Sequence, residues 1–138
     1  MTRRAVRAAA AVCIAVSASG CAFDGLNSLA LPGAVGRGAD ATKYHVEIAN
    51  VSTLESNSPV MIDDVVVGSV GTMRVRDWHA DVEISVKPGV VVPANAVASV
   101  GQTSLLGSMH LALDPPPGEA PRGRLAPGAT LGLNKSST

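Results

Sequence analysis

Alternating apolar and polar residues mark two stretches of the chain. YHVEI alternates from Tyr44 to Ile48, and DVEISV does the same from Asp81 to Val86. Because successive side chains of a strand point to opposite faces, each stretch predicts a strand with one buried face. A third predicted strand, at residues 109–113, has apolar residues at Leu111 and Leu113. We expect the buried residues of these three strands to be Val46, Ile48, Val82, Ile84, Val86, Leu111 and Leu113.

Five further β-rich runs complete this pattern. Turn-forming residues such as Asp63-Asp64, Gly71 and Pro88-Gly89 separate them, and no stretch beyond the N-terminal leader has sustained helical periodicity. Six to eight short strands at this spacing predict an all-β fold, a small barrel or sandwich. The five runs are residues 59–62, 65–70, 72–76, 96–100 and 109–113, and Leu131 and Leu133 are candidates for a last strand.

The first 21 residues have the pattern of a secretory leader. Three arginines precede an apolar run, Ala8–Val16, which is too short to span a bilayer because spanning takes about 20 residues. The leader ends in Ala18-Ser19-Gly20-Cys21, which resembles a bacterial lipobox with Ala18 in the place usually held by Leu. We therefore predict a signal peptide over residues 1–20 and a diacylglyceryl group on Cys21. The alternatives are ordinary secretion with a free Cys21 and an uncleaved leader.

The predicted organisation has four parts. The signal peptide of residues 1–20 is followed by a lipid-anchored flexible tether, residues 21–42, which is rich in glycine, alanine and serine. Residues 43–133 form the β-domain. Residues 134–138 form a polar tail.

Composition narrows the possible functions. The 11 basic and 11 acidic side chains balance, so the charge gives no indication of nucleic-acid binding. Both cysteines, Cys13 and Cys21, lie in the leader, so the sequence indicates neither a disulfide framework nor a cysteine metal site in the body.

No arrangement of polar residues in the sequence indicates catalysis, a metal or a cofactor. The separations of the histidines match no short metal motif. Asp63-Asp64 favours a turn between two strands over a carboxylate pair. Two serines near residue 105 lack the spacing of a nucleophile elbow. We therefore expect a non-enzymatic protein. The histidines are His45, His79 and His110, and the serines are Ser104 and Ser108.

The loop between the runs at 96–100 and 109–113 contains two adjacent leucines, Leu105 and Leu106, between polar residues and glycine. Two placements are open for them. They pack back into the core, or they form an exposed apolar tip of the kind that marks a binding surface. The glycines that flank the loop favour a projecting tip, because glycine allows sharp chain reversals.

Three elements of the predicted body resemble the MCE (mammalian cell entry) family. The first is the V-x-V-G-x-V pattern of residues 65–70, where Asp64 stands in the place of a glycine found in many members. The second is VPANAVASV at residues 92–100, similar to the family pattern I-P-x-x-[ST]-x-A-x-[IV]. The third is LLGSMHLAL at residues 105–113, similar to L-L-G-x-x-x-[IVL]-x-L.

The resemblance implies a fold, partners and a function. MCE domains are small β-barrels that form homo- or hetero-hexameric rings and work with an ABC-type permease and its ATPase on phospholipids, fatty acids or sterols. On this basis we expect Leu105 and Leu106 to line a central pore and to contact lipid. We also expect a lipid-anchored transport subunit on the extracytoplasmic side of the cell membrane.

Two alternatives to a transport subunit stay open. The leader resembles that of the lipoprotein subunit of actinobacterial MCE operons, which is longer and has a helical region after the domain. This chain stops at Thr138. A membrane-anchored structural or adhesion module is therefore one alternative, and a truncated paralogue without transport activity is the other.

Overall fold

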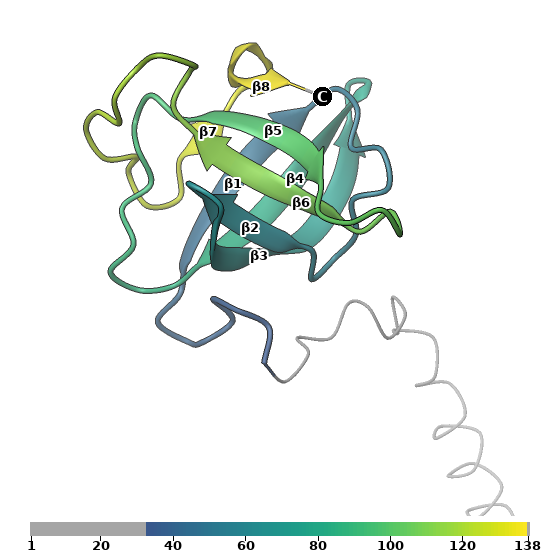
Figure 1. Cartoon of the computed structure of the whole chain (residues 1–138), viewed down its shortest axis with the longest axis horizontal. Helices are drawn as coiled ribbons and strands as arrows, with labels where there is room; N and C mark the ends of the chain where they lie inside the picture. The colour runs from purple at the N-terminus through teal and green to yellow at the C-terminus, as the bar shows by residue number, and fades with distance from the viewer. Residues whose placement is uncertain (1–32, 138) are drawn as a thin grey trace, which may run out of the picture.

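The computed structural model describes residues 33–137, and Figure 1 shows that they form one strongly curled β-sheet. The predicted signal peptide, Cys21 and the first part of the predicted tether lie outside the described residues. The sheet has eight strands in the order β7-β1-β4-β3-β2-β6-β5-β8, which confirms the predicted all-β class. The strands are β1 (Thr42–Ile48), β2 (Pro59–Ile62), β3 (Val65–Arg76), β4 (His79–Val86), β5 (Val97–Gln102), β6 (Met109–Asp114), β7 (Thr130–Leu131) and β8 (Ser136–Ser137).

The core lies inside the curl and is aliphatic. β1 pairs with β4 in antiparallel register from Thr42 opposite Val86 to Ile48 opposite Ala80, so the apolar members of both strands face inward together. The residues that the alternation predicted to be buried are confirmed, because all seven are 0% exposed. They are Val46, Ile48, Val82, Ile84, Val86, Leu111 and Leu113.

β3 corrects one prediction about strand boundaries. The runs at 65–70 and 72–76 were predicted as separate strands with a break at Gly71, but they form one strand of 12 residues. The irregularity at Gly71 is absorbed as a shift in register against β4 between Val70 and Met73. A bulge of this kind lets a strand bend and continue, which suits a sheet that curls.

Tight two-residue turns join β2 to β3 and β3 to β4. Asp63 and Asp64 have φ values of 50° and 60°, and Asp77 and Trp78 have φ values of 41° and 65°. Positive φ at both central residues is the signature of the type I′ turn, whose twist matches that of the flanking strands. The prediction that Asp63-Asp64 forms a turn is confirmed.

The C-terminal segment helps to close the curl and corrects a second prediction. Residues 134–138 were predicted as a polar tail, but a 3-10 turn, η3 (Leu133–Lys135), leads into β8, which pairs in parallel with β5. β7, just before this turn, pairs in parallel with β1. β7 and β8 therefore provide hydrogen-bonding partners for the backbone groups of β1 and β5. This backbone pairing does not depend on apolar side chains, which explains why a polar sequence is part of the sheet.

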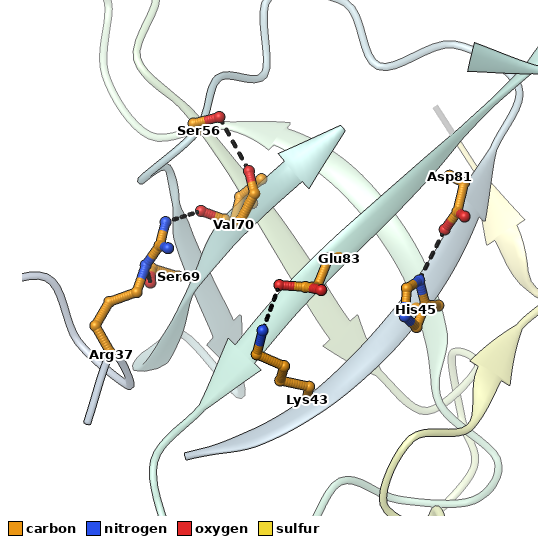
Figure 2. A network of polar contacts seen from close by, with 9 residues as sticks. Arg37, Lys43, His45, Ser56, Ser69, Val70, Asp81 and Glu83 are labelled. Carbon is orange, nitrogen blue, oxygen red and sulfur yellow. Dashed lines mark hydrogen bonds and ion pairs between the residues drawn. The ribbon is translucent and has the colours of Figure 1, made fainter. Parts of the chain in front are cut away.

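The described part of the predicted tether, residues 33–41, is held against the sheet instead of extending freely. Arg37 donates hydrogen bonds to Ser69 Oγ at 3.0 Å, to Asn57 Oδ1 at 2.9 Å and to the Val70 carbonyl at 2.7 Å. Figure 2 shows its side chain reaching Ser69 and Val70 on β3. These contacts anchor the segment and lead the chain directly into β1 at Thr42, one residue before the predicted start of the domain.

Candidate functional site

The loop between β5 and β6 exposes two large apolar side chains. The last paired residues of the hairpin are Gln102 and Met109. Between them, Gly107 N–H donates to the Ser104 carbonyl at 3.0 Å, which closes a turn with Leu105 and Leu106 in its two central positions. Leu105 is 103% exposed and Leu106 is 96% exposed. Of the two placements open from the sequence, the exposed tip is therefore the one that the structure has.

The same loop is held in shape by polar contacts. Thr103 N–H donates to the Ser108 carbonyl at 2.7 Å, and the Gln102 side-chain amide donates to the Ser104 carbonyl at 2.7 Å. Gly107 has a φ of 89°, a conformation that favours glycine. The leucines thus project from a hydrogen-bonded loop, so their exposure does not require a disordered tip.

His110 supports this loop from β6. Its Nδ1 lies 3.0 Å from Thr103 Oγ1. Its ring also lies across Gly101 on β5, where an added Cβ would come within 2.6 Å of the His110 Cε1 atom. Because Gly101 has no side chain, the His110 ring fits over β5 at this point. His110 therefore packs against β5 and contacts Thr103 at the base of the loop.

A shallow groove of about 480 Å³ lies beside the leucines. One wall is the segment from Thr53 to Pro59, between β1 and β2, and the other runs from Leu106 to Met109. Asn57, in the first wall, also accepts the hydrogen bond from Arg37. The groove therefore places an apolar side chain, Leu106, opposite a polar wall that is itself fastened to the sheet.

The charged side chains of β1, β3 and β4 form a separate cluster on the face of the sheet away from the core. His45 Nδ1 lies 3.0 Å from Asp81 Oδ1, and Lys43 Nζ lies 2.9 Å from Glu83 Oε1 (Figure 2). Arg76 Nε approaches Asp81 at 3.4 Å. The Lys43–Glu83 pair is of the exposed kind that contributes about 0–1 kcal/mol, and all three contacts join neighbouring strands of the sheet.

The predicted candidates for other chemistry fall at separate places. His45 and His79 lie on β1 and β4, whereas His110 lies on β6. Within residues 33–137, no three or more histidine, cysteine, aspartate or glutamate side chains are grouped so that they could hold a metal ion. Ser104 and Ser108 belong to the β5–β6 loop, and their carbonyls accept its internal hydrogen bonds. Cys21 lies outside the described residues.

Sequence reasoning missed two residues that the structure singles out. Arg37 is one, and no local pattern connects it with partners that lie 20 to 33 residues further along the chain. Trp78 is the other, with 99% of its surface exposed at the β3–β4 turn. A signal for Trp78 was present, because Asp-Trp occupies a two-residue turn at which Asp-Gly is preferred.

Comparison with known proteins identifies the family. A family model described as MlaD protein matches residues 40–116. The chain belongs to the MlaD/MCE family. This confirms the family that the three sequence elements indicated. The described part of this MCE chain contains no helix with the length and apolar character of a membrane span.

Two similar proteins extend the comparison. Lipoprotein LprN of Mycobacterium tuberculosis is 51% identical to this MCE chain over 118 residues, which is 82% of this chain and 31% of LprN. The chain thus spans about a third of the length of that relative. A chain of the Acinetobacter MlaFEDB complex in the ATP-bound Vtrans1 conformation has the same fold, with a TM-score of 0.62 and 12% identity. That likeness covers 99% of this chain and 94% of the other.

Proposed function

We propose that this chain is a non-enzymatic, lipid-anchored subunit of an MCE lipid-transport assembly on the extracytoplasmic side of the membrane. Its domain stands in a ring with other MCE subunits, beside an ABC-type permease and its ATPase. Leu105 and Leu106 form part of the apolar path that phospholipid, fatty acid or sterol follows through the ring.

The observation that carries this proposal is the tip of the β5–β6 loop. Full burial of a leucine side chain stabilises a protein by about 1.5–3 kcal/mol. Leu105 and Leu106 are exposed instead, in a loop that hydrogen bonds hold in place. Adjacent exposed apolar side chains on an ordered tip are typical of a surface that contacts an apolar ligand or partner. In an MCE domain, a ring of such tips offers acyl chains a continuous apolar surface.

The relatives support the remaining parts of the proposal. The relative that is 51% identical carries the name lipoprotein, which agrees with the predicted acylation of Cys21. The structure with the same fold is part of a complex described as ATP-bound, which agrees with an ATPase as a partner. The absence of a catalytic pattern in the sequence supports a non-enzymatic role.

A double substitution tests the role of the leucines. Leu105→Asn and Leu106→Asn together should leave the melting temperature nearly unchanged, because neither side chain is packed against the core. Uptake of the cognate lipid in cells should fall strongly, since two amides interrupt the apolar path. The measurements are a thermal melt of the purified protein and a lipid-uptake assay of cells that carry the variant.

The matched control applies the same chemical change at two other exposed apolar positions, Val91 and Leu133, which are 47% and 43% exposed. The control variant, Val91→Asn with Leu133→Asn, should transport lipid normally. Uptake that survives in the leucine variant, or that falls equally in both variants, would defeat the assignment of the tip.

A further inference from the structure

The turn between β3 and β4 combines an unfavourable backbone conformation with an exposed aromatic ring. Trp78, the one tryptophan of the chain, has a φ of 65° and is 99% exposed. A bulky residue with positive φ is rare, and Asp-Gly would form the same type I′ turn without this strain. The stability of the domain therefore does not explain this side chain, which indicates that it is kept for an interaction.

The tip that carries Trp78 is exposed but small. All five residues from 74 to 78 are exposed, and Val75 is 85% exposed. A stable protein interface takes about 20–30 residues from each partner, so this tip alone is too small to form one. Tryptophan is also enriched where proteins meet the boundary between lipid and water, because its ring is apolar and its N–H is polar. The size and chemistry of the tip therefore fit a lipid–water interface better than a protein surface.

The charges around the tip cancel. Residues 74–81 contain two arginines and two aspartates. Both arginines also line a small pocket with Asp81 and Glu83, so acidic groups of the same chain already lie beside them. Proteins that are directed to anionic lipid carry clusters of about four to eight basic residues, and this tip has no such excess. A contact between the tip and a membrane would therefore depend on its apolar side chains and not on the charge of the headgroups.

The chain between the proposed anchor and the domain is long enough for the tip to reach the same membrane. Gly36 lies beside Gly68 on β3, because a Cβ at Gly36 would come within 3.2 Å of the Gly68 Cα atom. The strand from Gly68 to Arg76 is at most about 27 Å long. From Cys21 to Gly33 the chain can span at most about 40 Å. The acyl anchor and the tip can therefore contact one bilayer.

We propose that the β3–β4 tip is a second membrane contact of this chain, in which Trp78 and Val75 enter the lipid–water interface. The indole ring lies at the level of the headgroups, and Val75 packs against the upper part of the acyl chains. An anchor together with a second contact fixes the orientation of the domain on the membrane, which a single flexible tether does not do. The proposal rests on the proposed acylation of Cys21 only because that anchor brings a membrane within reach.

The fluorescence of the chain tests this contact directly, because Trp78 is its one tryptophan. The full chain is reconstituted into phosphatidylcholine vesicles with and without lipid that is brominated on its acyl chains. The emission of Trp78 should shift to the blue, should be quenched by the brominated lipid and should be protected from iodide in the water. Phosphatidylglycerol in the vesicles or high salt in the buffer should change none of these results, because the tip carries no net charge.

Two valines of β3 provide a matched pair of variants. Val75→Asn places an amide at the tip, and Val65→Asn makes the same change at the other end of the strand, where Val65 is 60% exposed. Val75→Asn should weaken the blue shift and the quenching, whereas Val65→Asn should keep both. Equal effects of the two variants would overturn the proposal. Wild-type emission that stays unquenched by brominated lipid and open to iodide would overturn it as well.

The leucine tip is the other part of the domain that could enter lipid, and its variant separates the two. Leu105→Asn with Leu106→Asn should leave the quenching of Trp78 unchanged, because the β3–β4 tip makes the proposed contact itself. Loss of quenching in this variant would show that Trp78 has no membrane contact of its own, and the proposal would fail.

A cysteine variant distinguishes a failure of this contact from a failure of the proposed anchor. Cys21→Ala should need at least about tenfold more lipid to reach the same quenching, because the anchor raises the local concentration of the tip at the membrane. If wild type and Cys21→Ala are quenched at equal lipid concentrations, the anchor fails and the contact stands. If neither protein is quenched at saturating lipid, the contact fails, and lipid uptake in the leucine variant still decides the proposed function.

Discussion

Arg37 shows how one side chain can fix the path of a segment that the sequence describes only as glycine-rich. Its guanidinium hydrogen-bonds to Ser69 and Val70 on β3, so it ties the chain before β1 to the sheet. It also hydrogen-bonds to Asn57, in the wall of the groove beside Leu106. Sequence reasoning could not find it, because hydrogen bonds between distant residues leave no periodic signal. Burial, by contrast, was predictable residue by residue wherever apolar and polar positions alternate.

Replacing Arg37 tests this role. Arg37→Ala should lower the free energy of unfolding by roughly 1.5–3 kcal/mol, because the change leaves Ser69 Oγ and the Val70 carbonyl without a charged donor. Amide hydrogen exchange should also become faster in residues 49–58, where Asn57 loses the same donor. Urea unfolding and hydrogen exchange with mass spectrometry measure the two effects.

Lys87→Ala is the control for this substitution, since it removes an exposed cation whose side chain has no hydrogen bond or ion pair in the described part of the chain. It should change stability by less than about 0.5 kcal/mol. If Arg37→Ala behaved like Lys87→Ala in both measurements, the segment would not be anchored as described.

At the scale of elements, strands were predicted correctly where the pattern of apolar residues within the strand itself indicates a buried face. β1, β4 and β6 have apolar residues on one face, and the prediction of each was correct in type and place. The prediction of a break at Gly71 was wrong because a bulge, like a turn, is marked in sequence by glycine. β8 was missed because Ser136 and Ser137 owe their extended backbone to pairing with β5, more than thirty residues earlier.

The two exposed hairpin tips differ in how far the sequence predicted them. The β5–β6 loop was predicted with its leucines, and two placements were open until the structure showed both side chains in solvent. The β3–β4 tip was not predicted, although its turn has the length of a common hairpin connection. The pairing of β2 with β3 and β6 places the tip formed by Leu105 and Leu106 at the end of the sheet away from the β2–β3 turn.

At the scale of the whole molecule, the proposed anchor connects the described domain to a membrane. Cys21→Ala should move the protein from the membrane fraction to the soluble fraction, because several acyl chains are needed for firm attachment and this change removes the site for all of them. Incorporation of a clickable fatty acid should be lost as well. Cell fractionation and labelling measure the two results.

Cys13→Ala is the matched control, since Cys13 lies within the predicted signal peptide and not at its end. It should leave attachment and labelling unchanged. Unchanged fractionation and labelling in Cys21→Ala would exclude the anchor, and membrane retention with lost labelling would indicate an uncleaved leader.

The central claim is that the exposed tip formed by Leu105 and Leu106 contacts lipid during transport. Photocrosslinking in cells tests this claim most directly. A photoreactive amino acid is introduced at position 105 and, in a separate strain, at position 91. The account predicts a lipid adduct, visible by mass spectrometry of the purified protein, at position 105 and none at position 91. Adducts to protein alone at position 105, or equal lipid adducts at both positions, would contradict it.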